Sequence, residues 1–267
     1  MYVNQVLLHV TKNTVKNAKA NVIITHGIAE HSGRYEKMAK ILNEHQYNCI
    51  RYDLRGHGQS AGPRGKLKSY KIFIEDLHEI VKEVKDDQLP VYLLGHSLGG
   101  LITHIYAVTY QDVEGIITSG ATTDFVKDVL PLRIFGPKLL SWFAVKTNFA
   151  DDKLSRIPSV ERAYIDDPLN LKKMYGSLIG QSLVNGVRYL KKQLDQHNVP
   201  TLLMHGGNDK IVPHYMSEAM YLSIKHEDKT LKIYEDAYHE IFNDIDQDLC
   251  YNDVTFWLDE RTKKTET

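Results

Sequence analysis

The sequence predicts an α/β protein in which a mostly parallel central sheet is flanked by helices and carries an inserted helical cap. Three observations support this fold class. Short apolar runs alternate with longer amphipathic segments, a Gly-x-Ser-x-Gly motif separates one such run from a helix-capable segment, and the alternation is interrupted between about residues 121 and 198. Alternation of this kind favours a parallel sheet with helices on both faces.

Six short apolar runs are expected to form strands. They cover residues 22–25, 49–52, 91–94, 115–118, 201–204 and 231–234. The clearest helix between them is an apolar stripe from Tyr70 to Val84, with Ser69 as its expected N-cap.

The interruption predicts the domain organisation. It lies between two expected strands and contains an apolar-rich stretch followed by short, helix-like segments. A simple crossover needs far fewer residues, so a cap over the sheet is favoured over an extra helical layer without a role in binding. We therefore expect a core of residues 1–120 and 199–267, with residues 121–198 as the cap.

Length and composition exclude several classes of protein. The 267 residues fit one large domain with an insertion, and the net charge of −1 gives no electrostatic footprint for nucleic acid. Cys49 and Cys250 are too few for a disulfide framework and are expected to be small buried residues. Neither a secretory signal nor a membrane-spanning stretch is recognisable, which predicts a cytoplasmic protein.

The motif Gly-His-Ser-Leu-Gly at residues 95–99 has the context of a nucleophile elbow, since a strand is expected before it and a helix after it. The chain must turn sharply at Ser97, and the glycines remove side chains that would collide across that turn. The helix behind the serine also directs backbone N–H groups at its hydroxyl. A nucleophile is favoured over a chance glycine-serine turn.

A serine nucleophile needs a base, and the base needs a group that fixes its tautomer. Of the 13 histidines, His239 follows the last expected strand, while Asp209 follows the strand before it. Both should lie at the same sheet edge as Ser97. The chain order Ser97, Asp209, His239 is the order expected for α/β-hydrolases.

Other candidates are less favoured. Asp124 also follows a strand, but an N-cap for the first helix of the cap is the preferred interpretation. Asp53 and His57 are expected to shape a tight loop beneath the site. The second histidine of a His-Glu-x-x-His motif is missing after His239, so no metal is expected, and no cofactor is implied.

Two backbone donors are needed for the oxyanion of a tetrahedral intermediate. The N–H of Leu98, directly after the nucleophile, is one candidate. The N–H of Ile28 is the other, because it lies in the loop after the first expected strand and Gly27 permits a close approach. An ordinary glycine turn is the alternative for that loop.

Four segments together resemble the monoacylglycerol lipase and lysophospholipase family of α/β-hydrolases. They are His-Gly-Ile-Ala-Glu-His-Ser-Gly-Arg-Tyr at 26–35, Asp-Leu-Arg-Gly-His-Gly-Gln-Ser at 53–60, the motif at 95–99, and His-Gly-Gly-Asn-Asp at 205–209. The resemblance implies that Ser97, Asp209 and His239 form the triad, with Ile28 and Leu98 as oxyanion donors. It also implies that Glu30 and Arg34 pair, brace the oxyanion loop and line the glycerol end of the pocket. The alternative for that pair is a surface ion pair of little energetic weight.

The chain departs from the family pattern in three ways. Little more than 20 residues precede the first core strand, so one or both leading antiparallel strands are expected to be short or absent. Leu98 stands where many members have methionine, and the cap offers no motif that matches residue by residue.

The expected activity is that of a serine ester hydrolase cleaving monoacylglycerols or similar single-chain lipid esters through an acyl-enzyme, releasing fatty acid and glycerol. The apolar cap segment 126–149 would form the acyl-chain wall and make transient contact with membrane surfaces or micelles. Alternatives are a lysophospholipase, a short-chain carboxylesterase, an aminopeptidase-like amide hydrolase using Glu161 and Asp166, and an inactive binding protein. The sequence predicts no oligomeric state.

Overall fold

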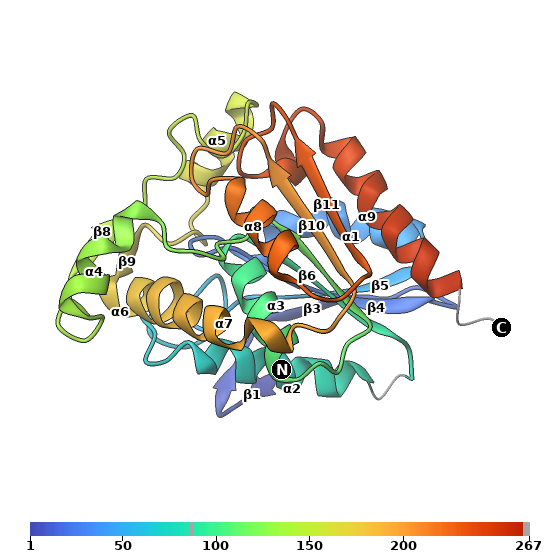
Figure 1. The fold of residues 1–267 in the computed structure, drawn as a ribbon, viewed down its shortest axis with the longest axis horizontal. Coiled ribbons are helices and arrows are strands. Elements are labelled where there is room, and N and C mark those ends of the chain that lie inside the picture. The colour runs from blue at the N-terminus through green and yellow to red at the C-terminus, as the bar shows by residue number, and fades with distance from the viewer. Residues whose placement is uncertain (86–87, 264–267) are drawn as a thin grey trace.

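A seven-stranded sheet forms the centre of the computed structural model, which describes residues 1–85 and 88–263 (Figure 1). The strand order is β11-β10-β7-β6-β4-β5-β3. The parallel strands are β4 Ala20–Thr25, β5 Tyr47–Tyr52, β6 Val91–His96, β7 Gly115–Ser119, β10 Thr201–Gly206 and β11 Lys229–Tyr234. Each predicted strand lies within one of them.

The antiparallel strands are short. β3 (Val10–Asn13) pairs with β5 at one edge of the main sheet. β1 (Tyr2–Val3) and β2 (Val6–Leu7) form a separate pair with each other. The expectation of short or absent leading strands is therefore met.

Nine α-helices are found in the described part of the chain. They are α1 Glu36–Glu44, α2 Lys71–Lys85, α3 Leu98–Thr109, α4 Leu130–Phe135, α5 Pro158–Asp166, α6 Gly176–Ile179, α7 Val187–Gln193, α8 Tyr215–Ser223 and α9 Gln247–Thr262. Short 3-10 helices are η1 Ser32–Tyr35, η2 Lys127–Val129, η4 Leu194–Gln196 and η5 Ile241–Asn243. Among the described residues, no helix is both long and apolar enough to cross a membrane.

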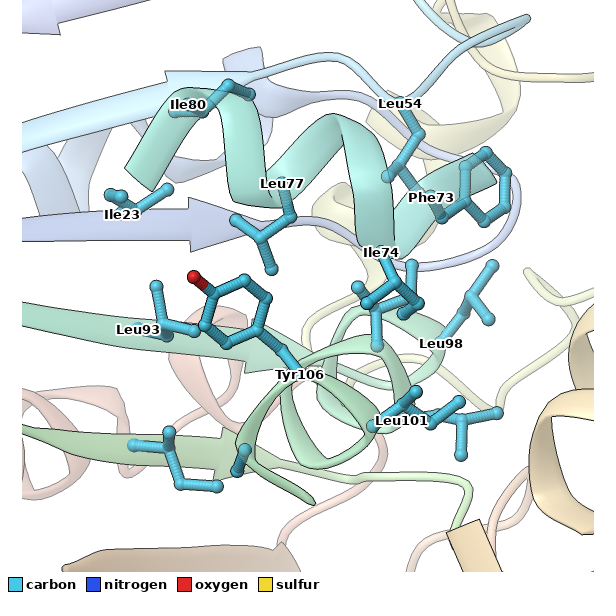
Figure 2. Packing of buried hydrophobic residues seen from close by; sticks show 14 of the residues in the cluster. Ile23, Leu54, Phe73, Ile74, Leu77, Ile80, Leu93, Leu98, Leu101 and Tyr106 are labelled. Carbon is cyan, nitrogen blue, oxygen red and sulfur yellow. The ribbon is translucent and has the colours of Figure 1, made fainter. Parts of the chain in front are cut away.

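Helices cover both faces of the sheet because successive strand residues point to opposite sides. Ile23 of β4 belongs to the core cluster shared with α2 and α3, whereas its neighbours Val22 and Ile24 pack with α1 and α9. Figure 2 shows the first of these faces, with Leu77 of α2 close to Tyr106 of α3. Burying a side chain of this size contributes about 1.5–3 kcal/mol.

The predicted cap stretch forms an insertion between β7 and β10, here called the insertion (residues 121–198). It contains α4, α5 and a continuous helical run in which α6, a π-helix at Gly180–Gly186 and α7 follow one another. It also contains a two-stranded ribbon of β8 (Ala144–Lys146) and β9 (Lys173–Tyr175), which the expected helical cap did not include. Figure 1 shows the ribbon beside α4 and α6, on the opposite side of the view from α9.

The last helix of the insertion packs against the rest of the protein. Val187 and Leu190 of α7 join the core cluster around α3. The division into a core and a cap domain stays a prediction.

Two smaller expectations concern single residues. Ser69 Oγ accepts a hydrogen bond from the N–H of Lys71 at 3.3 Å, in keeping with the expected cap of α2. Cys49 and Cys250 are buried free thiols, and burial raises the pKa of each to about 12.

Candidate active site

Ser97 stands in the turn between β6 and α3, at the carboxyl edge of the sheet. Its backbone has φ 54° and ψ −114°, a strained conformation for a residue with a Cβ. Two glycines make the turn feasible. A Cβ on Gly99 would lie 2.0 Å from the carbonyl oxygen of Thr25, and one on Gly95 would lie 2.3 Å from that of Gly99. The predicted elbow geometry is thus present at Ser97.

His239 and Asp209 meet at the same edge. His239 Nδ1 donates a hydrogen bond to Asp209 Oδ2 at 2.7 Å, and both side chains are almost fully buried. Because a carboxylate only accepts, the proton lies on Nδ1 and Nε2 is left as the basic nitrogen.

Asp124, the rival acid, lies elsewhere. Its carboxylate forms an ion pair with Lys191 at 2.7 Å, and Phe125 N–H donates to it at 2.7 Å. The N-cap of the following helix η2 is Val126, so the N-cap role expected for Asp124 is wrong. Asp124 instead forms a surface ion pair with Lys191 of α7.

The carboxylate of Asp209 accepts four hydrogen bonds. Ile211 N (2.8 Å) and Val212 N (2.9 Å) donate to Oδ1, while His239 and His205 Nε2 (3.1 Å) donate to Oδ2. Burial alone would raise the pKa of Asp209, but the charge of His239 and these hydrogen bonds outweigh it and hold the pKa well below its usual range. His205 was not singled out from the sequence, although it opens the motif that contains Asp209.

The basicity of His239 is set by opposing effects. Burial lowers the pKa of His239, but the charge of Asp209 and its hydrogen bond raise it more, so the net pKa lies above the ordinary value. The ring of His96 lies 4.7 Å away, and burial, followed by the charge of His239, lowers the pKa of His96 to about 3. His96 therefore stays neutral and places no second positive charge beside the base.

The loop after β4 lies directly above the elbow. A Cβ on Gly27 would be 3.3 Å from Ser97 Cβ, and the N–H of Gly27 donates to Glu30 Oε1 at 2.5 Å. Ile28 and Leu98 line the same cavity as Ser97. The N–H of Leu98 lies at the start of α3, where helix geometry supplies no intrahelical acceptor.

The predicted pair of Glu30 and Arg34 is present and buried, so the surface alternative does not apply. Arg34 Nε donates to Glu30 Oε2 at 3.1 Å, and its terminal nitrogen bonds to a second carboxylate, that of Glu240. Burial would lower the pKa of Arg34, but the two carboxylates outweigh it and raise the pKa. Glu240 was not predicted; its position next to His239 was the only available signal.

The two carboxylates, and not the guanidinium, face the cavity. Glu30 and Glu240 line it, whereas Arg34 is not among the described residues that do. The expectation that Arg34 lines the pocket is therefore corrected: this arginine lies between the two carboxylates and holds them.

A cavity of about 690 Å³ joins these groups to the insertion. Its polar lining near the catalytic loops includes Glu30, Lys153, Lys210, His239 and Glu240. Its apolar lining comes from an insertion cluster that includes Val129, Leu132, Leu140, Ile179 and Leu183. No group of His, Cys, Asp or Glu in the described residues is arranged to hold a metal ion.

Glu161 and Asp166, the acidic residues considered for an amine substrate, do not line the cavity in the part of the chain that the structure describes. Glu161 Oε1 accepts hydrogen bonds from the N–H groups of three successive residues, at 3.0, 2.8 and 3.3 Å for 153, 154 and 155. Asp166 is exposed at the end of α5. Glu161 therefore stabilises the loop at residues 153–155.

Asp53 shapes the loop beneath the site, as expected. Its carboxylate accepts from Ser32 N (2.8 Å) and Gln59 N (2.7 Å), which ties the loop after β5 to the start of η1. His57 is fully buried there against Phe73, and burial lowers the pKa of His57 to about 3.

The fold, with a serine elbow and a His–Asp pair at one edge of its sheet, defines an α/β-hydrolase of the serine hydrolase class. Comparison with known proteins agrees with this class. The chain belongs to the family described as serine aminopeptidase (S33), which matches residues 16–246.

Relatives share most of the length of the chain. It is 32% identical over 243 residues to a monoacylglycerol lipase of Mycolicibacterium smegmatis, covering 89% of this chain and 87% of that protein. It is 30% identical over 256 residues to human monoglyceride lipase, covering 91% and 84%. The crystal structure of a Paleococcus ferrophilus monoacylglycerol lipase superposes with a TM-score of 0.87 at 29% identity, over 96% of this chain and 99% of that one. The resemblance inferred from the loop motifs is confirmed.

Proposed function

We propose that this chain hydrolyses monoacylglycerols and similar single-chain lipid esters, with Ser97 as nucleophile, His239 as base and Asp209 as the group that orients the base. One observation carries the proposal: Ser97 of the elbow, His239 and an apolar wall from the insertion line a single cavity of about 690 Å³. A cavity of this size suits a small-molecule substrate. The relatives named monoacylglycerol lipase support the same substrate class.

The reaction follows from the positions of these groups. His239 Nε2 takes the proton of Ser97 as Oγ attacks the ester carbonyl, and the N–H groups of Ile28 and Leu98 receive the negative charge on the oxygen. The C–O bond to the alcohol then breaks, and His239 returns the proton to the departing alcohol. Water, deprotonated by His239, attacks the acyl-enzyme and releases the fatty acid.

The polar part of the cavity favours a neutral polyol as leaving group. Glu30 already accepts hydrogen bonds from Gly27, Tyr35 and Arg34, which leaves it little capacity for an ammonium group. Lys210 donates to Asp152 at 2.9 Å, so this lysine has an acidic partner and is a poor phosphate site. These contacts support glycerol esters over lysophospholipids and aminoacyl amides.

Exposed apolar side chains on the insertion support transient contact with membrane surfaces or micelles. Ile134, Phe135, Leu139 and Trp142 are each more than 60% exposed. They flank Leu132 and Leu140, which line the cavity, so a lipid could pass from a surface into the site. Cosedimentation with phosphatidylcholine vesicles tests this contact: Trp142→Ser should weaken it, and no sedimentation of the wild type would reject it.

A panel of substrates tests the proposed activity. Monoacylglycerols of graded acyl length should be hydrolysed with higher kcat/KM than a lysophosphatidylcholine or an aminoacyl amide, because the polar lining suits an uncharged alcohol. A methyl ester of the same fatty acid serves as the control for the glycerol group. Preference for the amide would reject the lipase assignment, and equal rates for glycerol and methyl esters would reject a contribution of the polar lining to binding of the alcohol.

A further inference from the structure

Asp244 is a fully buried carboxylate in the loop that carries the catalytic histidine (the His239 loop, residues 235–246). This loop connects β11 to α9 and contains only the short helix η5, so regular secondary structure does little to hold it. Asp244 Oδ2 accepts the N–H of Tyr238 at 2.8 Å, and Oδ1 accepts that of Ile245 at 2.9 Å. The first of these bonds closes the loop from the residue before His239 to Asp244.

The same carboxylate also reaches the insertion. Arg156 donates to it twice, from its backbone N (2.9 Å to Oδ1) and from Nε (3.0 Å to Oδ2). Next to this contact, Ser155 Oγ donates to the carbonyl of Asn243 at 2.8 Å, and the N–H of Glu240 donates to the carbonyl of Leu154 at 2.8 Å. The His239 loop is therefore fixed to residues 154–156 at Glu240, Asn243 and Asp244.

We propose that Asp244 is a positioning residue for the reaction: it holds His239 in hydrogen-bond contact with Asp209 by closing the His239 loop and anchoring it to Arg156. The inference rests on the proposed function, because it assumes that His239 is the base. Burial of this carboxylate is costly without its four N–H donors, so the arrangement is stable only when the loop and the insertion are docked together. Misplacement of a catalytic group by about 1 Å is enough to slow a reaction about 100-fold.

Asp244→Asn is the direct test, since it keeps the shape of the side chain but removes one acceptor oxygen. We expect kcat to fall about 10- to 100-fold for p-nitrophenyl acetate and for a long-chain p-nitrophenyl ester alike, with KM little changed. The acidic limb of the kcat/KM profile should move to lower pH, because a displaced His239 loses the support of Asp209. Asp246→Asn is the matched control: Asp246 binds the same Arg156 at 2.6 Å, but at the surface, and its loss should change none of these values.

Each outcome decides a separate question. The inference is overturned if Asp244→Asn folds and keeps both the wild-type kcat and the wild-type acidic limb of the pH profile. It is also overturned if kcat falls only for the long-chain ester, because Asp244 would then only maintain the apolar wall of the cavity. If Asp244→Asn does not fold, Arg156→Gln is measured in its place, and we expect kcat to fall for both esters by a smaller factor. An unchanged kcat in Arg156→Gln would overturn the anchoring role of Arg156. If the wild-type chain hydrolyses neither ester, the proposed function is contradicted, and not the role of Asp244 within it.

Discussion

Replacing Ser97 by alanine is expected to lower kcat for ester hydrolysis about a million-fold. The other candidate groups would remain in place, but no acyl-enzyme could form without the hydroxyl. The strained backbone at Ser97 does not depend on its side chain, so the variant should fold as the wild type does. Hydrolysis of a monoacylglycerol and labelling by a serine-directed fluorophosphonate measure the loss.

Ser223→Ala provides the control, because Ser223 is an exposed residue at the end of α8. It should react with the fluorophosphonate at the wild-type rate. A folded wild type that is not labelled would favour the inactive binding protein, and labelling that survives in Ser97→Ala would place the nucleophile elsewhere.

Asp209→Asn should lower kcat about 10⁴-fold. The amide would favour the wrong tautomer of His239, and the charge that raises the pKa of that histidine would be gone. In the wild type, activity should be lost as the pH falls through the raised pKa of His239, because only the neutral ring is a base. The variant should show its residual activity extending to lower pH.

Asp124→Asn tests the competing acid in the same assay. Its carboxylate faces Lys191 and not His239, so both the rate and the pH profile should match the wild type. A larger loss in Asp124→Asn than in Asp209→Asn would contradict the assignment of the acid.

The parallel core could be predicted because five of its six parallel strands are buried on both faces. Such strands appear in the sequence as continuous apolar runs, and β6 is one of them, with every residue buried. The position of Ser97, Asp209 and His239 at one edge followed from the same fact, since parallel strands place their carboxyl ends together.

The remaining features depend on contacts that the chain makes across long separations. Arg34 and Glu240 are 206 residues apart, and no local pattern links them. The ribbon of β8 and β9 has three residues in each strand, too few for a recognisable alternation. Asp124 has the local features of an N-cap, but the Lys191 side chain of α7 competes for it.

The docking of residues 154–156 on the His239 loop has a consequence for how such enzymes diverge. Asp244 belongs to the β11–α9 connection and Arg156 to the insertion, so the two sides of one buried ion pair lie in different segments. An insertion exchanged between relatives would bring its own residue opposite Asp244. Recombination of these segments is therefore constrained at this pair, and substitution within the insertion should be tolerated more readily than its transplantation as a whole.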